Sequence, residues 1–179
     1  MSNFIIYLNG VQRVMDFNNI NISEIHRDDG PAVIEYDNKN RLLMEQWYTN
    51  GLLNRKDKPA ITSYDVDGTI LSEEWYKNGI LDRFDKPAVI EYYTSGVIKK
   101  ESYYENGILH RKNKPAVIQY DEQRNIIKSV FYENGRVHRE DGPAYISETE
   151  NIINFWVDNK QLDLSDFQMH LTKKLIMIL

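Results

Sequence analysis

A single spacing governs this sequence, because a Pro-Ala pair returns every 28 residues without slippage. Every proline in the chain belongs to this series, and an arginine precedes each proline by four residues. Self-similarity at a fixed period predicts a chain built from one repeated supersecondary unit rather than a globular domain with a unique core. The repeated positions are Pro31, Pro59, Pro87, Pro115 and Pro143, with Arg27, Arg55, Arg83, Arg111 and Arg139.

The residues after each Pro-Ala pair predict a strand, because they are rich in β-branched and aromatic side chains. In the third unit this segment is residues 88–92, and a polar turn follows at residues 94–96. A second strand-like segment, residues 97–104, ends at Asn106-Gly107, a dipeptide suited to the positive φ angles of a tight hairpin turn. Each unit is therefore predicted to contain two strands and two chain reversals.

The predicted fold class is all-β: an elongated single-layer array of 28-residue β-hairpin repeats with a short C-terminal capping α-helix. Five tandem units and a degenerate last unit occupy residues 26–163. Residues 1–25 are expected to form an N-terminal strand and an irregular cap or insertion, and residues 164–179 the helix. Repeat units bury apolar surface only against their neighbours, so both ends of such an array need covers.

The last segment has the pattern of an amphipathic helix. Ser165 or Asp166 is expected to cap its N-terminus. We expect its apolar stripe to close the last open face of the sheet. The stripe consists of Phe167, Leu171, Leu175 and Ile178.

Strand alternation separates a core face from an outer face. Ala88, Ile90 and Tyr92 fall together on the expected core side of the third unit. The second strand of each inner unit carries two adjacent aromatic residues, which must point to opposite faces. One of these two aromatic rows is expected to be buried, and the other to be available for binding. The pairs are Trp47-Tyr48, Trp75-Tyr76, Tyr103-Tyr104 and Phe131-Tyr132.

The aromatic-x-Asn-Gly signature, seen at residues 75–81, resembles the MORN repeat over about residues 26–163. An arginine and then Asp-Gly-Pro-Ala or Asp-Lys-Pro-Ala stand where MORN units have His-Gly. The His-Arg-x-Asp-Gly-Pro-Ala form at residues 26–32 and 138–144 looks like that of repeat proteins from large DNA viruses, phages and some bacteria. The resemblance implies an elongated sheet of hairpins that serves in protein interaction or assembly, and it implies no catalytic residues.

The composition argues against several function classes. The chain has 179 residues and a formal net charge of -5, which disfavours nucleic acid as a partner because phosphate groups are repelled. It has no cysteine, hence no disulfide, thiolate metal site or cysteine nucleophile. The sequence also shows no secretion signal and no apolar run near the roughly 20 residues that span a bilayer. We expect a cytoplasmic protein, or one of the host cytoplasm or the virion if its origin is viral.

Two charged series repeat with the unit. The arginines are expected to pair internally with glutamates of the same period rather than to bind an anionic ligand. These glutamates are Glu45, Glu73 and Glu101. A basic stripe, formed by Lys58, Lys86 and Lys114, serves either as a solvated edge or as a site for an acidic partner.

A third series holds the histidines. His26, His110 and His138 share their position with Asn54 and Asp82, which favours a turn-capping role over metal binding. Equivalent residues of successive units also lie too far apart to share a metal ion, whose ligands lie about 2 Å away.

No catalytic motif stands outside the repeat, so we expect no enzyme activity, no cofactor and no metal. The leading interpretation is a repeat scaffold for protein-protein interaction or assembly, with an unidentified protein partner. Two alternatives stay open. One is a structural protein that self-assembles, either as a homo-oligomer or in a virion. The other is a carbohydrate-binding protein that stacks sugar rings on the aromatic ladder.

Overall fold

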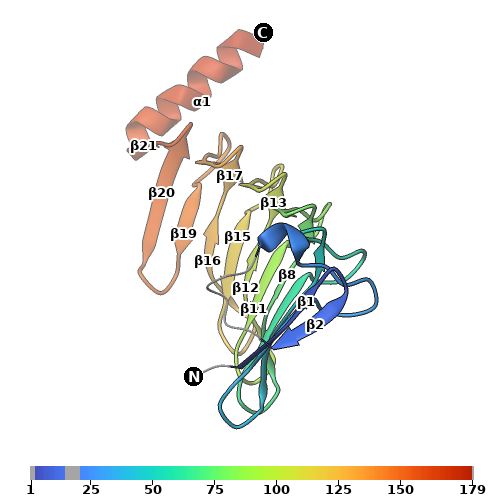
Figure 1. Ribbon diagram of the computed structural model, residues 1–179. Coiled ribbons are helices and arrows are strands. Elements are labelled where there is room, and N and C mark those ends of the chain that lie inside the picture. Colours follow the sequence, from blue (N-terminus) through green and yellow to red (C-terminus); the bar gives the residue numbers. More distant parts are fainter. Residues whose placement is uncertain (1–2, 15–20, 179) are drawn as a thin grey trace.

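The computed structural model describes residues 3–14 and 21–178, and it confirms an all-β array with one C-terminal helix (Figure 1). Each unit contributes two long strands to a common antiparallel sheet. The first strands are β3 (Val33–Tyr36), β7 (Ile61–Tyr64), β11 (Val89–Tyr92), β15 (Val117–Tyr120) and β19 (Tyr145–Ser147). The second strands are β4 (Leu42–Gln46), β8 (Ile70–Glu74), β12 (Ile98–Ser102), β16 (Ile126–Val130) and β20 (Ile152–Val157).

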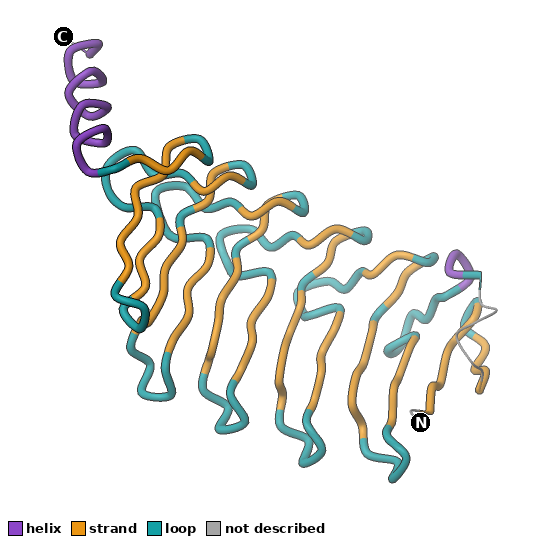
Figure 2. Tube along the Cα trace, turned by 90° about the vertical axis from the view of Figure 1, so that its left-hand side faces the viewer, coloured by secondary structure: helices purple, strands orange, loops and turns teal. Residues whose placement is uncertain are grey.

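A small hairpin follows the long hairpin in each of the first four units. These hairpins form separate two-stranded sheets. They are β5 (Tyr48–Thr49) with β6 (Leu52–Leu53), β9 (Tyr76–Lys77) with β10 (Ile80–Leu81), β13 (Tyr104–Glu105) with β14 (Ile108–Leu109), and β17 (Tyr132–Glu133) with β18 (Arg136–Val137). In Figure 2 the long hairpins stand side by side, and the small hairpins step along one end of them.

The remaining strands lie at the two ends of the sheet. β1 (Asn3–Leu8) and β2 (Val11–Val14) form one end, and β21 (Lys160–Leu162) lies at the other, before helix α1 (Leu164–Ile178). The complete sheet has 13 strands in the order β2-β1-β3-β4-β7-β8-β11-β12-β15-β16-β19-β20-β21. Units therefore add to the sheet one after another in a single direction, as a repeat architecture requires.

The predicted second strand is divided in two. β12 ends at Ser102, and Tyr103 connects it to β13. The backbone N–H of Tyr103 donates to the carbonyl of Ala116 at 2.8 Å, whereas its own carbonyl accepts from the N–H of His110 at 3.2 Å. The chain changes its pairing partner at this residue, from the next unit's first strand to the small hairpin. Each of the first four units therefore has four strands, where two were predicted.

The alanine after each proline is fully buried, with an exposed fraction of 0% in all five units. Ala88 donates its N–H to the carbonyl of Ser102 at 2.9 Å and accepts from the N–H of Trp75 at 2.8 Å, so it joins two successive units. Ile90 on the same face is buried and Tyr92 is half-buried. The predicted core side of the third unit is thus confirmed.

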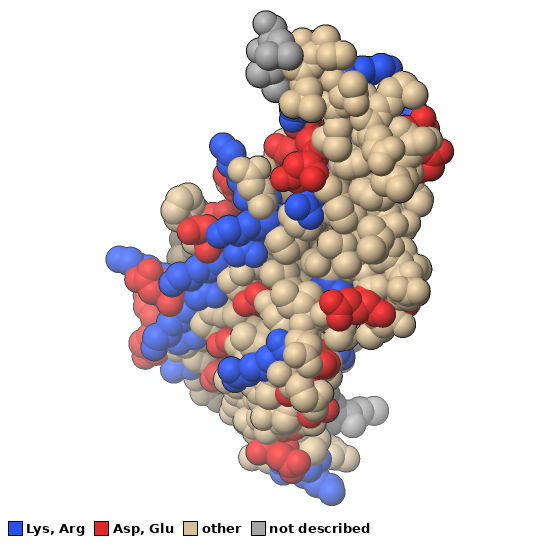
Figure 3. Space-filling view, turned by 180° about the vertical axis from the view of Figure 1, so that it is seen from behind, with Lys and Arg blue, Asp and Glu red and all other residues tan. Residues whose placement is uncertain are grey.

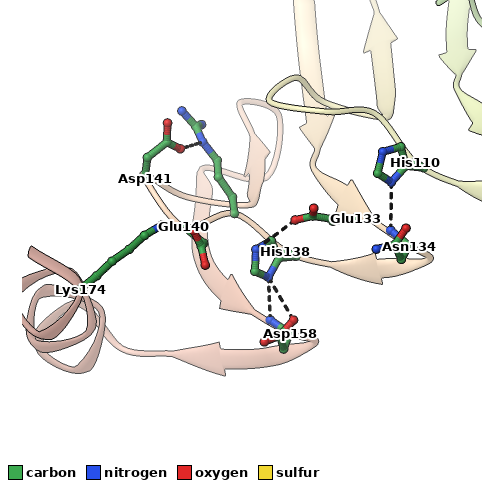
Figure 4. A network of polar contacts seen from close by, with 9 residues as sticks. His110, Glu133, Asn134, His138, Glu140, Asp141, Asp158 and Lys174 are labelled. Atoms are coloured by element: carbon green, nitrogen blue, oxygen red, sulfur yellow. Dashed lines mark hydrogen bonds and ion pairs between the residues drawn. The ribbon is translucent and has the colours of Figure 1, made fainter. Parts of the chain in front are cut away.

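The residue after each small hairpin caps the turn of the following hairpin. Asp82 Oδ1 accepts from the backbone N–H of Asn106 at 3.1 Å, and His110 Nδ1 accepts from that of Asn134 at 3.1 Å (Figure 4). The same bond is made by His26, Asn54 and His138. The predicted turn-capping role of this series is confirmed.

The small hairpins also approach one another through their Asn-Gly turns. Gly107 donates its N–H to the carbonyl of Leu81 at 2.8 Å. Its φ of 79° and the φ of 49° at Asn106 are typical of a type I′ turn. A Cβ added at Gly107 would lie 3.1 Å from Cγ2 of Ile80 in the preceding hairpin. Glycine is needed here for both the turn and the close packing.

The N-terminal end reuses the geometry of the inner units. β1 pairs with both β2 and β3, and the N–H of Tyr7 donates to the carbonyl of Ala32 as that of Trp47 does to Ala60. A 3-10 helix, Ile22–Glu24, precedes the first connecting loop. Ile6 and Ile25 form a buried cluster with Val33. Part of the expected insertion, residues 15–20, lies outside the described residues.

Asp163 caps helix α1, so the expectation that Ser165 or Asp166 would do so was wrong. Its Oδ1 accepts from the backbone N–H of Asp166 at 2.8 Å and from the hydroxyl of Ser165 at 2.7 Å. These bonds lower the pKa of the Asp163 carboxyl below its usual value. β21 ends at Leu162, so Asp163 is the first residue free to act as the cap.

The cover that the helix provides is smaller than expected. The ring of Phe167 is buried and stacks on Phe155 with 4.6 Å between the ring centroids, and Leu171 is half-buried. Leu175 is 65% exposed, and the helix projects beyond the sheet (Figure 1). The side chain of Ile178 lies outside the described residues. Of the described side chains of the apolar stripe, Phe167 and Leu171 are covered and Leu175 is not.

Replacing the capping side chain tests the hydrogen bond between hairpins. His110→Ala removes the acceptor for the N–H of Asn134, and we expect the free energy of unfolding to fall by about 1 kcal/mol. His110→Asn is the control, because Asn54 makes the same bond in another unit. Urea unfolding followed by tryptophan fluorescence measures both. An equal loss in the two variants would contradict the capping role.

Candidate binding surface

The connecting loops of successive units line up at the end of the sheet that carries the small hairpins. We call this row the loop face; it consists of residues 26–31, 54–59, 82–87, 110–115 and 138–143. Lys and Arg side chains gather in rows along this side of the molecule, with Asp and Glu between them (Figure 3). The loop face contains all five repeated arginines and the three lysines of the basic stripe.

The guanidinium of each repeated arginine lies over an aromatic ring. Cζ of Arg83 is 3.7 Å from the centroid of the Trp75 ring, and its Nη1 donates to the carbonyl of Pro87 at 3.1 Å. Such a cation-aromatic contact contributes about 0.5–2 kcal/mol, depending on its exposure. The equivalent pairs are Arg27 on Tyr7, Arg55 on Trp47, Arg111 on Tyr103 and Arg139 on Phe131, at 3.6–4.1 Å.

The expected ion pairs between these arginines and the repeated glutamates are not formed in the described part of the chain. Glu73 instead accepts a hydrogen bond from the hydroxyl of Tyr92 at 2.6 Å. Burial lowers the pKa of Arg83, and the charge of Glu73 offsets part of this effect from a longer distance. The guanidinium of Arg83 contacts the Trp75 ring and the carbonyl of Pro87 rather than a glutamate.

The glutamates tie successive units together through tyrosine hydroxyls. Tyr64 donates to Glu45 at 2.8 Å, and burial together with this bond raises the pKa of Tyr64 to about 12. Tyr120 donates to Glu101 at 2.9 Å in the same way. Ser129 interrupts the glutamate series, and Glu148 stands at the position of the tyrosine in the next unit, so this tie is missing there.

The aromatic ladder is largely covered by other side chains of the protein. The inner row, Trp47, Trp75, Tyr103 and Phe131, lies under the arginines, and Trp75 and Tyr103 are buried. The outer row, Tyr48, Tyr76, Tyr104 and Tyr132, is half-buried throughout. Some outer hydroxyls bond back to the preceding strand, as that of Tyr76 in β9 donates to Glu74 in β8 at 3.0 Å. Both rows are therefore largely part of the packing.

The loops occur in two forms. The first form is seen in the first loop, where Arg27 Nε donates to Asp29 at 2.8 Å. A Cβ added at Gly30 would lie 2.5 Å from Cζ of this arginine. This guanidinium lowers the pKa of Asp29. The fifth loop repeats that arrangement with Arg139, Asp141 and Gly142 (Figure 4).

The three central loops take the second form. Their residue before the lysine adopts a positive φ, 61° at Asp57 and 54° at Asp85. The lysine that replaces glycine is exposed in each loop. No ion pair of the described chain includes Lys58, Lys86 or Lys114. The basic stripe is thus a set of free cations on the loop face.

Phe84 is the most exposed large apolar side chain of the loop face, with 95% of its surface open to solvent. This residue was not among the binding residues predicted from the sequence. The signal was present, because the equivalent position holds a charged residue in each of the other four loops. Those residues are Asp28, Lys56, Lys112 and Glu140. An apolar side chain thus interrupts a charged column at the centre of the array.

Two open hollows flank Phe84. One, of about 440 Å³, lies toward the fourth loop and is also lined by Tyr104 and Lys112. The other, of about 610 Å³, lies toward the second loop and is also lined by Tyr76 and Lys56. Phe84 therefore stands on a ridge between two depressions that have both apolar and basic walls.

No three histidine or carboxylate side chains among residues 3–14 and 21–178 come together as a metal site. Within the same ranges, no helix has the length and apolar character needed to cross a bilayer. A scan against protein-family models and searches of curated proteins and of solved structures found no match to the chain. The resemblance to MORN repeats therefore stays a prediction.

Exchanging an arginine for lysine tests the stacked junction. Arg83→Lys keeps the charge but loses the planar contact with Trp75 and the bond to Pro87, so we expect the free energy of unfolding to fall by about 2 kcal/mol. Lys86→Ala, at an exposed lysine of the same loop, is the control and should change the free energy of unfolding by less than about 0.5 kcal/mol. Urea unfolding measures both. Similar stabilities for Arg83→Lys and the unaltered protein would refute the role of the stack.

Proposed function

We propose that this protein is a non-catalytic repeat scaffold that binds another protein through its loop face. The exposure of Phe84 carries the proposal. Burying a phenylalanine side chain in an interface contributes about 1.5–3 kcal/mol, and large aromatic residues are enriched in protein interfaces. A free phenylalanine side chain in a column of charges has no evident role in holding the array together.

The two hollows beside Phe84 support the same proposal. Interfaces gain most of their binding energy from a few side chains that pack into depressions, and near-neutral contacts surround them. A partner side chain seated in either hollow would touch Phe84 and one of the half-buried tyrosines, Tyr76 or Tyr104. The MORN-like signature favours the same class of function.

The aromatic ladder gives less support to carbohydrate binding. Sugar rings stack on exposed aromatic faces, whereas a guanidinium covers one face of each inner ring. The outer tyrosines are half-buried, so their ring faces are not fully open to a sugar.

A photo-crosslinking experiment tests the loop face. Replacing Phe84 with benzoylphenylalanine places a reactive group at the proposed centre of contact. In cells that naturally contain the protein, we expect irradiation to give a discrete crosslinked product. An excess of unlabelled wild-type protein should suppress that product, and the Phe84→Lys variant should not. Phe84→Lys retains the fold, because two other loops carry lysine at the equivalent position.

The matched control places the same reactive group at Val66, an exposed apolar residue in the turn between β7 and β8. No product is expected from that position. Equal products from positions 66 and 84, or none from 84, would contradict binding through the loop face.

A second candidate function is self-assembly through the C-terminal edge of the sheet. In the inner units the second strand pairs on both sides, as β16 does with β15 and β19. Residues 152–154 of β20 pair with β19, and no strand of the described chain pairs with their other side. Ile153 within this segment is 63% exposed. An open edge with apolar side chains is a site for strand pairing with another chain.

Light scattering coupled to size-exclusion chromatography tests this second function. We expect the mass of the wild-type protein to rise with concentration, and Ile153→Lys to keep it monomeric, because a charge on an edge strand opposes pairing. Ile126→Lys, at another exposed isoleucine, is the control and should assemble like the wild type. A monomeric wild type at every concentration would remove this candidate.

A further inference from the structure

The charge of the loop face is unequally distributed among its five loops. Residues 54–58 hold three cations and one anion, residues 82–86 hold two of each, and residues 110–114 hold three cations and no anion. With histidine neutral, the three central loops carry a net charge of +5, in a chain whose total is -5. The outer loops, residues 26–30 and 138–142, each hold one cation and two anions, a net charge of -1.

The cations at the centre are available to a partner. Lys56 and Lys112 occupy the same column as Phe84, one loop to either side, and both are exposed. No ion pair includes either of them among the residues that the structure describes. Lys86 of the basic stripe lines both hollows, beside Lys112 in one and Lys56 in the other. A single apolar residue is thus placed between free positive charges on a predominantly acidic protein.

We propose that the loop face binds an extended acidic segment of a partner protein, with an apolar side chain of that segment packed on Phe84. This inference rests on the proposed scaffold function and specifies the chemistry of the partner. Charge complementarity between an acidic peptide and the central loops steers association and sets the orientation of the segment. The apolar contact with Phe84 anchors the segment at one position on the loop face.

The repeat spacing sets the pattern of the acidic segment. Each unit adds two strands to the sheet, so equivalent loops lie about 10 Å apart, twice the distance of about 4.8 Å between strands. A peptide in the polyproline II conformation advances about 3.1 Å per residue with three residues per turn, so side chains three positions apart point the same way and reach successive loops. A matching segment has an apolar residue opposite Phe84 and acidic residues about three positions to either side, opposite Lys56 and Lys112.

The same surface is less suited to nucleic acid. Asp57 lies between two lysines, and Asp82 and Asp85 flank Arg83 and Phe84, so carboxylates interrupt the basic row. A phosphate backbone presents a charge at every nucleotide and would meet these carboxylates. A peptide can instead place neutral residues opposite them.

A peptide-display selection tests the inference. The full-length protein is used to select from a random library of peptides of about 12 residues, and the strongest binder is then synthesised with a fluorescein label for anisotropy measurements. We expect the selected peptides to share acidic residues about three positions on either side of an apolar residue. We expect Phe84→Lys to weaken binding at least about tenfold, and the double variant Lys56→Glu with Lys112→Glu to do the same. Raising the ionic strength should also weaken binding.

The matched control is the double variant Lys39→Glu with Lys160→Glu. It changes the net charge equally at two exposed lysines outside the loop face and should bind like the wild type. Equal weakening by the two double variants would overturn the inference, because it would show a general charge effect. Binding of a labelled oligothymidylate of about 20 nucleotides as tightly as the peptide, with the same sensitivity to Phe84→Lys, would overturn it in favour of nucleic acid.

The remaining outcomes separate this inference from the scaffold function. Selected peptides that depend on Phe84 but have no acidic pattern would overturn the inference and leave the scaffold function standing. Failure of the library to yield any peptide that depends on Phe84 would overturn the inference, whereas the scaffold function would then be decided by the crosslinking at position 84.

Discussion

The array depends on one arginine at each junction between units. In the third junction the guanidinium of Arg83 lies on the ring of Trp75 and donates to the carbonyl of Pro87, so one side chain joins the end of one unit to the start of the next. The bond to the carbonyl fixes the spacing of arginine and proline. The contact with the Trp75 ring fixes the distance between Arg83 and the preceding strand, β8. The spacing of arginine and proline is the same in all five units, whereas the longer chain between Tyr7 and Arg27 still leaves the contact with the ring in place.

Much of the fold could be predicted because its signals are local. The Asn-Gly turns and the capping series, such as Asp82 with Asn106, follow from backbone preferences and hydrogen-bonding capacity alone. The division of the second strand was not predictable in this way. At Tyr103 the sequence continues to look like a strand, and only the change of backbone partner, from Ala116 to His110, separates the two pieces.

Less of the candidate site could be predicted, because periodicity identifies sets of residues without assigning partners within them. Arginines, aromatic residues, glutamates and tyrosines all return with the same period, so Arg83 could be matched with Glu73 as readily as with Trp75. In the structure Arg83 packs on the ring of Trp75, and Glu73 accepts a hydrogen bond from Tyr92. Phe84 was not predicted for the opposite reason, since a prediction based on regularity passes over a position where the regularity fails.

The column that contains Phe84 lies outside both contacts that hold a junction together, the arginine stack and the turn cap. Its occupants, Asp28, Lys56, Phe84, Lys112 and Glu140, therefore vary without any change in the sheet beneath them. Each unit thus presents one variable side chain on an unchanged sheet. Under the proposed binding function, point mutations in single units would change the side chains offered to a partner, and duplication of a unit would lengthen the column, while the sheet is inherited unchanged.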